Sequence, residues 1–360
     1  MLGGSRPELD ALVGVRSAGH WRVAWRRFKR DKVAVASAAF VAFVVFAIFP
    51  GAPLAGKLLG HGPNAFFPYA VDANLRPSGP GTIVPNTPLM PETHTASGYS
   101  LVHPPPPPGT GKALLPLGAD GTLGRDELLR LLYGGRVSLE VAFGATLLAL
   151  LIGLVLGSTA AYFGGWIDSV ISRFTDLVMA FPLLLFVIML GSTVSSKFDH
   201  VTLHGLFNEG VLSLVGLIGL FTWFYPARIV RAQILSLRGR EFVEAAAMTG
   251  ARDTWIMRRH LFPHLVPPLV VYATLMLATN ILLEAGITFL GVGIKLPTAS
   301  WGNLLATTWG TVLSPSPYNP RTVQPWLTIL PSAAIFLSVL SLNQFGEGLR
   351  EALDPRGVRR

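Results

Sequence analysis

The sequence contains no cysteine and has few charged residues. Of its 360 residues, 14% are Asp, Glu, Lys or Arg, whereas a soluble globular domain averages about 25%. The absence of cysteine excludes a disulfide framework, a thiolate zinc site and a cysteine nucleophile. The low charge content excludes a soluble single domain. The net charge of +9 does not predict a nucleic-acid partner, because the charged residues lie between long uncharged runs instead of covering a surface.

Long apolar runs make up much of the remainder. Each of six runs is at or near the ~20 residues that a helix needs to cross a bilayer. Apart from Glu284, which lies in an extension of the fifth run, none contains Asp, Glu, Lys or Arg. We therefore predict six transmembrane helices, over residues 33–49, 141–163, 177–194, 210–227, 265–283 (extending to about 294) and 326–346. The first run is not a cleavable signal peptide, because a basic stretch of 32 residues precedes it.

Lysine and arginine are divided unequally between the two sides of these spans. Six spans place both termini on one side, and that side holds 20 of the 29 Lys and Arg residues. Cytoplasmic loops carry such an excess, so we predict that both termini are cytoplasmic. Trp21, Trp25 and the basic run 26–30 predict an interfacial helix that binds anionic membrane lipid.

A long proline-rich loop follows the first span. Residues 50–125 hold about half of the 28 prolines, including the run Pro104–Pro108. Proline removes backbone donors and favours polyproline II, so residues 51–115 are predicted to form an extended, poorly packed spacer, with a binding role as the alternative. Within it, residues 107–112 resemble a phosphate-binding loop, but Pro106 and Ala113 stand where the motif needs Gly and Ser or Thr. We predict no ATPase in this chain.

Other catalytic or metal-binding patterns are incomplete. His260 and His264 have the i,i+4 spacing of two metal ligands on one helix face. Pro263 lies between them and no third ligand is evident, so no metal site is predicted. No Gly-x-Ser-x-Gly motif accompanies a Ser–His–Asp set, so a hydrolase is not predicted.

The cytoplasmic segment 228–264 carries the most informative pattern. Residues 240–249 are rich in helix formers, Gly250 ends that helix, and Asp253 is the expected N-cap of a second short helix over 254–260. Such a helix–turn–helix could lie on the membrane, read DNA or dock in a groove of another protein. A DNA reader would not be tethered to the membrane at both ends. Small alanines on a short helix favour docking in a groove.

This segment resembles the EAA loop of binding-protein-dependent ABC importer permeases through Glu244-Ala245-Ala246, Gly250, His260 and Pro263. Further segments are similar to the C-type subunit of the dipeptide/oligopeptide permease subfamily, at residues 117–120, 123–126, 131–139, 162–168, 180–182, 284–291, 300–303 and 348–356. The resemblance covers nearly everything except residues 1–20 and about 51–115. The long proline-rich loop and one added residue at Gly121-Thr122 depart from the family pattern.

The resemblance implies an all-α membrane protein with the type I ABC importer permease fold, located in the plasma (inner) membrane. Its parts would be a basic N-terminal segment (residues 1–32), the first span (33–49), the loop with the helix that leads to the second span (50–137), a five-helix core (138–346) and a cytoplasmic tail (347–360). The implied partners are a second homologous permease subunit, two cytoplasmic ABC ATPases that use ATP and Mg, and an extracytoplasmic solute-binding protein. This chain would be no enzyme and would bind no cofactor. Di- or oligopeptides are the implied solutes, with metal chelates as an alternative.

The resemblance also assigns candidate site residues. Those expected to couple to the ATPase are Glu244, Ala245, Ala246, Gly250, Ile256, His260 and Pro263. Glu284 is considered from its residue type: a charge near mid-helix costs ~2.5–3.5 kcal/mol, so it must face protein or water. It is either a pathway-lining or gating carboxylate or an interhelical hydrogen-bonding group. Pro182 and Pro331 are expected to kink their spans.

Two rival functions belong to other classes. An ion-gradient-driven secondary transporter would need several intramembrane ionisable residues and usually an inverted repeat. The sequence offers Glu284 and no repeat. An intramembrane enzyme would need a catalytic set that the sequence lacks. The ATP-driven importer subunit is therefore the preferred interpretation.

Overall fold

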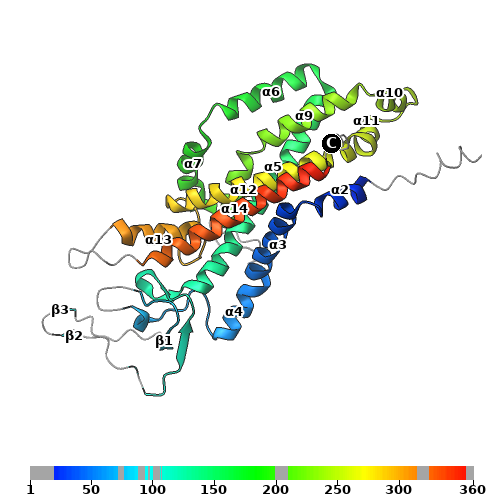
Figure 1. Cartoon of the computed structure of the whole chain (residues 1–360). Coiled ribbons are helices and arrows are strands. Elements are labelled where there is room, and N and C mark those ends of the chain that lie inside the picture. The colour runs from blue at the N-terminus through cyan, green and yellow to red at the C-terminus, as the bar shows by residue number, and fades with distance from the viewer. Residues whose placement is uncertain are drawn as a thin grey trace, which may run out of the picture.

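A computed structural model describes residues 20–71, 77–87, 94–95, 98–99, 106, 108–198, 210–313 and 324–353. Long helices run side by side through the molecule, and the strands gather at one end (Figure 1). The helices are α2 His20–Phe28, α3 Lys32–Phe46, α4 Ala52–Leu59, α5 Glu127–Phe163, α6 Gly165–Met179, α7 Leu183–Phe198, α8 Val211–Leu220, α9 Phe224–Arg238, α10 Glu241–Met248, α11 Asp253–Ile256, α12 Phe262–Phe289, α13 Trp301–Leu313 and α14 Pro325–Leu353.

The predicted spans fall on these helices. Four continuous helical runs have the length and composition of a membrane span, namely Lys32–Leu59, Glu127–Phe163, Asp253–Phe289 and Pro325–Leu353. Two further candidates are bent pairs, Gly165–Met179 with Leu183–Gly191 and Val211–Leu220 with Phe224–Arg238. The described part of the chain therefore has four helical runs that are long and apolar enough to cross a membrane, or up to six if each bent pair is one span.

Two of the predicted helices are broken in the structure. Residues 177–194 are interrupted at Ala180–Pro182, where the chain bends by 80°. This confirms the kink expected at Pro182, whose ring removes a backbone donor. Residues 210–227 are interrupted between α8 and α9 by a 45° bend. At that bend, the hydroxyl of Thr222 donates to the carbonyl of Ile218 at 2.8 Å, which satisfies a group that the broken helix leaves free. By contrast, α14 continues through Pro331.

Helix α5 forms the centre of the bundle, against α8, α9 and α12. Glycines on α5 allow α9 to approach closely. A Cβ atom at Gly153 would lie 2.8 Å from the amide nitrogen of Ala227, and one at Gly157 would overlap the carbonyl oxygen of the same residue. Small residues at a helix crossing are a common means of packing within membranes. The buried apolar core between α5, α7, α8 and α12 includes Val137, Val141, Ala145, Val187, Val211, Leu214, Leu217, Ile218 and Ile287.

The strands belong to a small folded unit, which we call the strand module (the described residues of 61–130). Strand β1 Thr82–Pro85 pairs antiparallel with β4 Lys112–Leu115, and β5 Ala119–Asp120 pairs with β6 Arg125–Asp126. A further short pair joins β2 His94–Thr95 and β3 Gly98–Tyr99. The module has its own core of Phe67, Ala70, Val84, Ala113, Leu115 and Ala119.

The prediction of a poorly packed spacer over residues 51–115 is therefore wrong for the described part. Alternate residues of β1 and β4 point inward and bury Val84, Ala113 and Leu115. The helix that carries the first predicted span continues beyond residue 49, because a π-helical turn over Ala47–Gly51 joins α3 to α4. Of the proline run, residues 104, 105 and 107 lie outside the described residues.

Buried charges join the strands of this module to the first turn of α5, which the module includes. Arg130, whose side chain is fully buried, forms an ion pair with Asp120, and Arg125 pairs with the same carboxylate at 3.0 Å. Arg130 also donates to Asn64 Oδ1 at 3.1 Å. Asp126 caps α5 by accepting from the amide of Leu129 at 3.1 Å. Because buried charges are costly unless paired, this cluster fixes how the module sits on the helix.

Candidate functional site

The predicted helix–turn–helix is present and is called the hinge here (residues 240–263). It lies at the same end of the molecule as α2 and the C-terminal end of α14, and the strand module lies at the opposite end (Figure 1). Six spans would place the hinge and both ends of the chain on one side. The side that faces the cytoplasm and the exact number of spans stay predictions.

Gly250 makes the turn that ends α10. Its φ is +79°, a left-handed conformation that residues with a Cβ adopt rarely. The amide of Gly250 donates to the carbonyl of Ala247 at 3.0 Å, and that of Ala251 donates to Ala246 at 3.2 Å. This is the Schellman arrangement. A Cβ at position 250 would meet no atom within 4 Å, so the turn requires glycine for its backbone conformation and not for space.

The second helix differs from the prediction. It begins one residue earlier than expected, with Arg252 as N-cap and Asp253 in the first turn. The carboxylate of Asp253 does not cap the helix, because it accepts a hydrogen bond from the hydroxyl of Tyr162 at 2.6 Å. The helix does not stop before the membrane either. A π-helical segment, Met257–Leu261, joins α11 to α12, and Pro263 lies in the first turn of α12, where its missing N–H is not needed.

One face of the hinge is buried against α9 and the start of α12. Val243 and Ile256 join an apolar cluster with Val230, Ile234 and Leu261. Ile256, one of the predicted coupling residues, has a side chain that is 2% exposed and faces this interior. The cluster therefore holds α10 and α11 against α9 and the start of α12.

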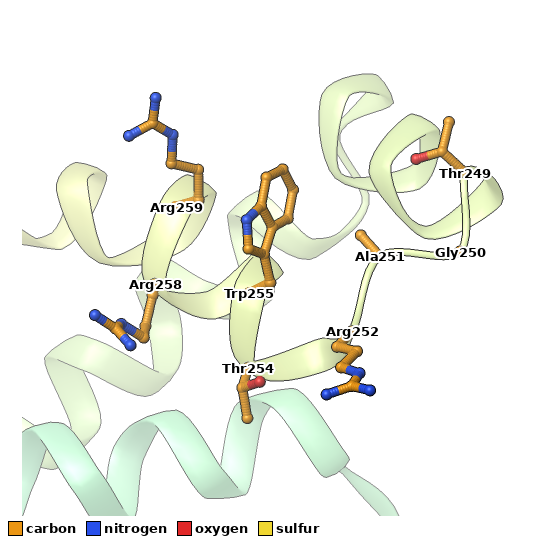
Figure 2. A pocket seen from close by; sticks show the side chains of 8 residues that line it. All are labelled: Thr249, Gly250, Ala251, Arg252, Thr254, Trp255, Arg258 and Arg259. Atoms are coloured by element: carbon orange, nitrogen blue, oxygen red, sulfur yellow. The ribbon is translucent and has the colours of Figure 1, made fainter.

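The opposite face of the hinge is open. Glu244, Ala245, Gly250 and Pro263 are exposed, and Ala246 and His260 are half-buried. Apolar side chains also reach the surface there, since Met248 is 83% exposed and Trp255 is 51% exposed. An open pocket of about 830 Å³ is lined by Thr249, Gly250, Ala251, Arg252, Thr254, Trp255, Arg258 and Arg259, and Trp255 stands at its centre (Figure 2).

Ring contacts connect α10 to the start of α12. The ring of Phe242 stacks on His264 with a centroid distance of 5.6 Å, and Trp255 contacts His260 edge-on at 5.1 Å. His264 Nδ1 donates to the carbonyl of His260 at 2.7 Å. The two histidines therefore pack the hinge together, although their spacing in the sequence resembles that of metal ligands.

Charges are separated along the exposed face. Glu241 and Glu244 lie on α10, whereas Arg252, Arg258 and Arg259 follow the turn. All five residues are exposed, as are Arg240 before α10 and Asp253 after the turn, so the hinge is net acidic before Gly250 and net basic after it.

Glu284 lies inside the bundle, far along α12 from the hinge. Its side chain is fully buried and accepts a hydrogen bond from the hydroxyl of Thr288 at 3.0 Å. The hydroxyls of Ser138 and Ser300 also face its carboxyl group. Ser138 in turn accepts from the amide of Trp301 at 3.2 Å. The residue thus belongs to a buried polar network that joins α5, α12 and the start of α13.

Three polar contacts between helices were not expected from the sequence. Besides the Tyr162–Asp253 bond, Arg231 of α9 binds Asp168 of α6 through two hydrogen bonds of 2.6 Å, and Arg228 pairs with Asp176 at 2.5 Å. Tyr162 and Asp168 were noticed only as parts of a family motif. The sequence also shows opposite charges in the segments that form α6 and α9, but this pattern does not identify which of the charged residues pair.

Comparisons with known proteins agree with the geometry. Residues 149–359 match the family of binding-protein-dependent transport system inner membrane components, and residues 19–77 match the N-terminal TM domain of oligopeptide transport permease C. A solved amino acid ABC transporter with histidines matches 62% of this chain and 93% of its own at 15% identity, with a TM-score of 0.41. That value is too low to add to the family assignment.

Relatives in three bacteria were compared with the chain. A putative peptide permease protein of Brucella ovis is 40% identical over 239 residues, which are 66% of this chain and 72% of the relative. The oligopeptide transport system permease protein OppC of Haemophilus influenzae is 33% identical over 93% of this chain and 88% of its own. OppC of Escherichia coli is 38% identical over 65% of this chain and 70% of its own. The chain belongs to the inner-membrane permease components of binding-protein-dependent ABC importers, within the dipeptide/oligopeptide C-type subfamily.

Proposed function

We propose that this chain is one of two permease subunits that together enclose a pathway for di- or oligopeptides, and that its hinge docks in a groove of a cytoplasmic ABC ATPase. The observation that carries the proposal is the two-sided hinge. One face is fixed to the chain's own helices, and the other exposes apolar and charged side chains that find no partner surface within the described part of the chain.

The exposed face has the features of a helix-in-groove ligand. Trp255 and Met248 supply apolar anchors, and aromatic anchors often dominate the binding energy of an interface. Ala245 is small enough to let the groove approach α10. Glu244 on one side and Arg258 on the other would select a groove with a basic part and an acidic part, because complementary charges set orientation and specificity.

The buried face would transmit the motion. Val243 and Ile256 bind the hinge to α9, and the π-helical segment makes α11 continuous with α12. A displacement of the docked hinge, driven by ATP-dependent closure of the ATPases, would therefore move both long helices together. His260 and Pro263 would act at this junction by packing and by starting α12, without contact with nucleotide.

Peptides are proposed as the solutes because of the names of the relatives from Haemophilus influenzae and Escherichia coli. A solute-binding protein would deliver them to the end that carries the strand module. ATP and Mg would be used by the partner ATPases, and a second permease would supply the other half of the pathway. For Glu284 we propose the packing role, since its buried hydroxyl partners tie three elements together.

The proposal is tested in the complete importer, reconstituted in proteoliposomes with a radiolabelled tripeptide. Gly250→Asp and Glu244→Lys should lower tripeptide uptake about tenfold while the ATPases continue to hydrolyse ATP. Gly60→Asp is the matched control, because Gly60 also follows a helix with a positive φ of +75° and has open space around it.

Two results would count against the proposal. Unchanged uptake in both hinge variants would show that the hinge is not the coupling element. Uptake that survives the removal of ATP, but not the collapse of an ion gradient, would instead support a secondary transporter.

A further inference from the structure

Helix α6 is attached to the bundle in an unusual way. Its apolar side chains face outward, since Trp166 is 76% exposed and Val170, Phe174 and Leu177 are also exposed. Thr175 is the one fully buried side chain on this helix, all of whose residues are described. Hydrophobic packing against the rest of the chain is concentrated near the C-terminal end of α6, where Phe174 stacks on Trp223 and where Val178 and Met179 pack against the apolar cluster that contains Trp223.

Two ion pairs connect the inward face of α6 to α9, and we call them the α6 clasp (Asp168–Arg231 and Asp176–Arg228). Arg231 binds both carboxylate oxygens of Asp168 at 2.6 Å. Such bidentate pairs are directional and stronger than single contacts. Ser172 donates to the same carboxylate at 3.3 Å. The Asp176–Arg228 pair is more exposed and should contribute less.

The clasp spans an open space. A pocket of about 410 Å³ lies between α5, α6 and α9, and Arg228, Arg231 and Asp176 are among the residues that line it. Side chains do not fill this space, so the two ion pairs bridge α6 and α9 across it.

Helix α9 has the hinge on its other side. Val230 and Ile234 of α9 lie in the apolar cluster that holds Val243 and Ile256 of the hinge. Arg231, next to Val230 in the sequence, points to α6 instead. Helix α9 is thus a rigid element between the hinge and the clasp. Beyond the 80° bend, α7 places Val187 in the central core.

We infer that Asp168 and Arg231 are positioning residues for transport. They transmit the displacement of the hinge through α9 to α6 and α7, the two helices that meet at the 80° bend. This inference rests on the proposed function of the hinge. Without the clasp, the hinge and α9 would still move with the ATPases, but α6 and α7 would not follow. ATP hydrolysis would then continue while the pathway failed to switch between its two states.

The test uses the complete importer in proteoliposomes with the radiolabelled tripeptide. Arg231→Gln should lower uptake about tenfold with ATP hydrolysis maintained. The charge-swapped double variant, Asp168→Arg with Arg231→Asp, should restore most of the uptake. Arg136→Gln is the matched control: its guanidinium pairs with Glu140 at 2.8 Å, but both residues lie on α5, so that pair joins no two helices.

The outcomes separate the clasp from the hinge. If Gly250→Asp uncouples transport and Arg231→Gln behaves like the unmodified protein, the clasp inference is wrong and the proposed function stands. If neither Gly250→Asp nor Glu244→Lys has an effect, the proposed function itself fails. A parallel loss of uptake and ATP hydrolysis in Arg231→Gln would assign the clasp to assembly and overturn the inference. Should the swap reach the membrane in reduced amounts by immunoblot, Arg231→Lys must retain more uptake per molecule than Arg231→Gln.

Discussion

The hinge and the strand module both contain apolar and charged residues, but they place the charged residues differently. The hinge buries Val243 and Ile256 and leaves its charges at the surface. The strand module buries Asp120 and Arg130 against each other. Exposed charges are weak contributors to stability, but they can recognise a partner. Buried charge pairs hold one geometry, because breaking them leaves an uncompensated charge. The module is thus fixed on its own chain, whereas under the proposed function the hinge would bind another protein.

The largest expected effect concerns the buried charges. Arg130→Met keeps the volume of the side chain but leaves Asp120 with Arg125 alone, and should destabilise the strand module by about 3–5 kcal/mol. Hydrogen exchange of the amides in β1 and β4 measures this opening free energy. Arg136→Met removes a pair whose arginine is 38% exposed and should cost no more than about 1 kcal/mol. Equal losses of stability in Arg130→Met and Arg136→Met would show that the buried ion pair contributes no more than the exposed one.

An intermediate effect is expected at the buried face of the hinge. Ile256→Ala creates a cavity beside Leu261 and should cost about 2–4 kcal/mol, seen as faster hydrogen exchange over residues 253–261. Trp255→Ala is the comparison on the exposed face. It should change exchange less than Ile256→Ala does, because it removes only the edge-on contact with His260, but it should weaken the association with the ATPases, as a lost aromatic anchor would. If Trp255→Ala instead loosens the hinge as Ile256→Ala does, the two faces do not have separate roles.

The smallest effect is expected at the polar link between α5 and the hinge. Tyr162→Phe removes the hydroxyl that donates to Asp253 and should cost about 1 kcal/mol of local stability. Exchange of the amides in α11 would report this loss. Tyr225→Phe is the control, since Tyr225 is exposed and lies on another helix. An identical, negligible change in both variants would show that the link does not hold the hinge.

Much of the helical architecture followed from composition, because long runs without charge have few alternatives to spanning a membrane. The hinge followed from helix formers around Gly250. The break between α8 and α9 was not predicted, because no proline marks it. Pro226 lies beyond the break, in the first turn of α9. The strand module was missed because the many prolines of residues 51–115 outweighed the short alternating segments that pair across the loop.

The polar contacts around the hinge could not have been predicted in the same way. Tyr162 and Asp253 are 91 residues apart, and Asp168 and Arg231 are 63 apart. Each residue has many possible partners in the sequence, and only the packing of α5, α6 and α9 selects one. Likewise, helical spacing alone did not distinguish Ile256, which is buried, from its neighbour Trp255, which is exposed.

The glycine contact between α5 and α9 has a mechanical consequence. Helix α9 has 15 residues and is roughly 22 Å long. Gly153 and Gly157 contact its first two turns, whereas Ile234 further along packs against Ala161 of α5 and against the hinge. A methyl group added at Gly157 would push the two helices apart at their crossing and would displace the rest of α9 towards the hinge. These two glycines of α5 thereby set the orientation of a surface two helical turns or more away.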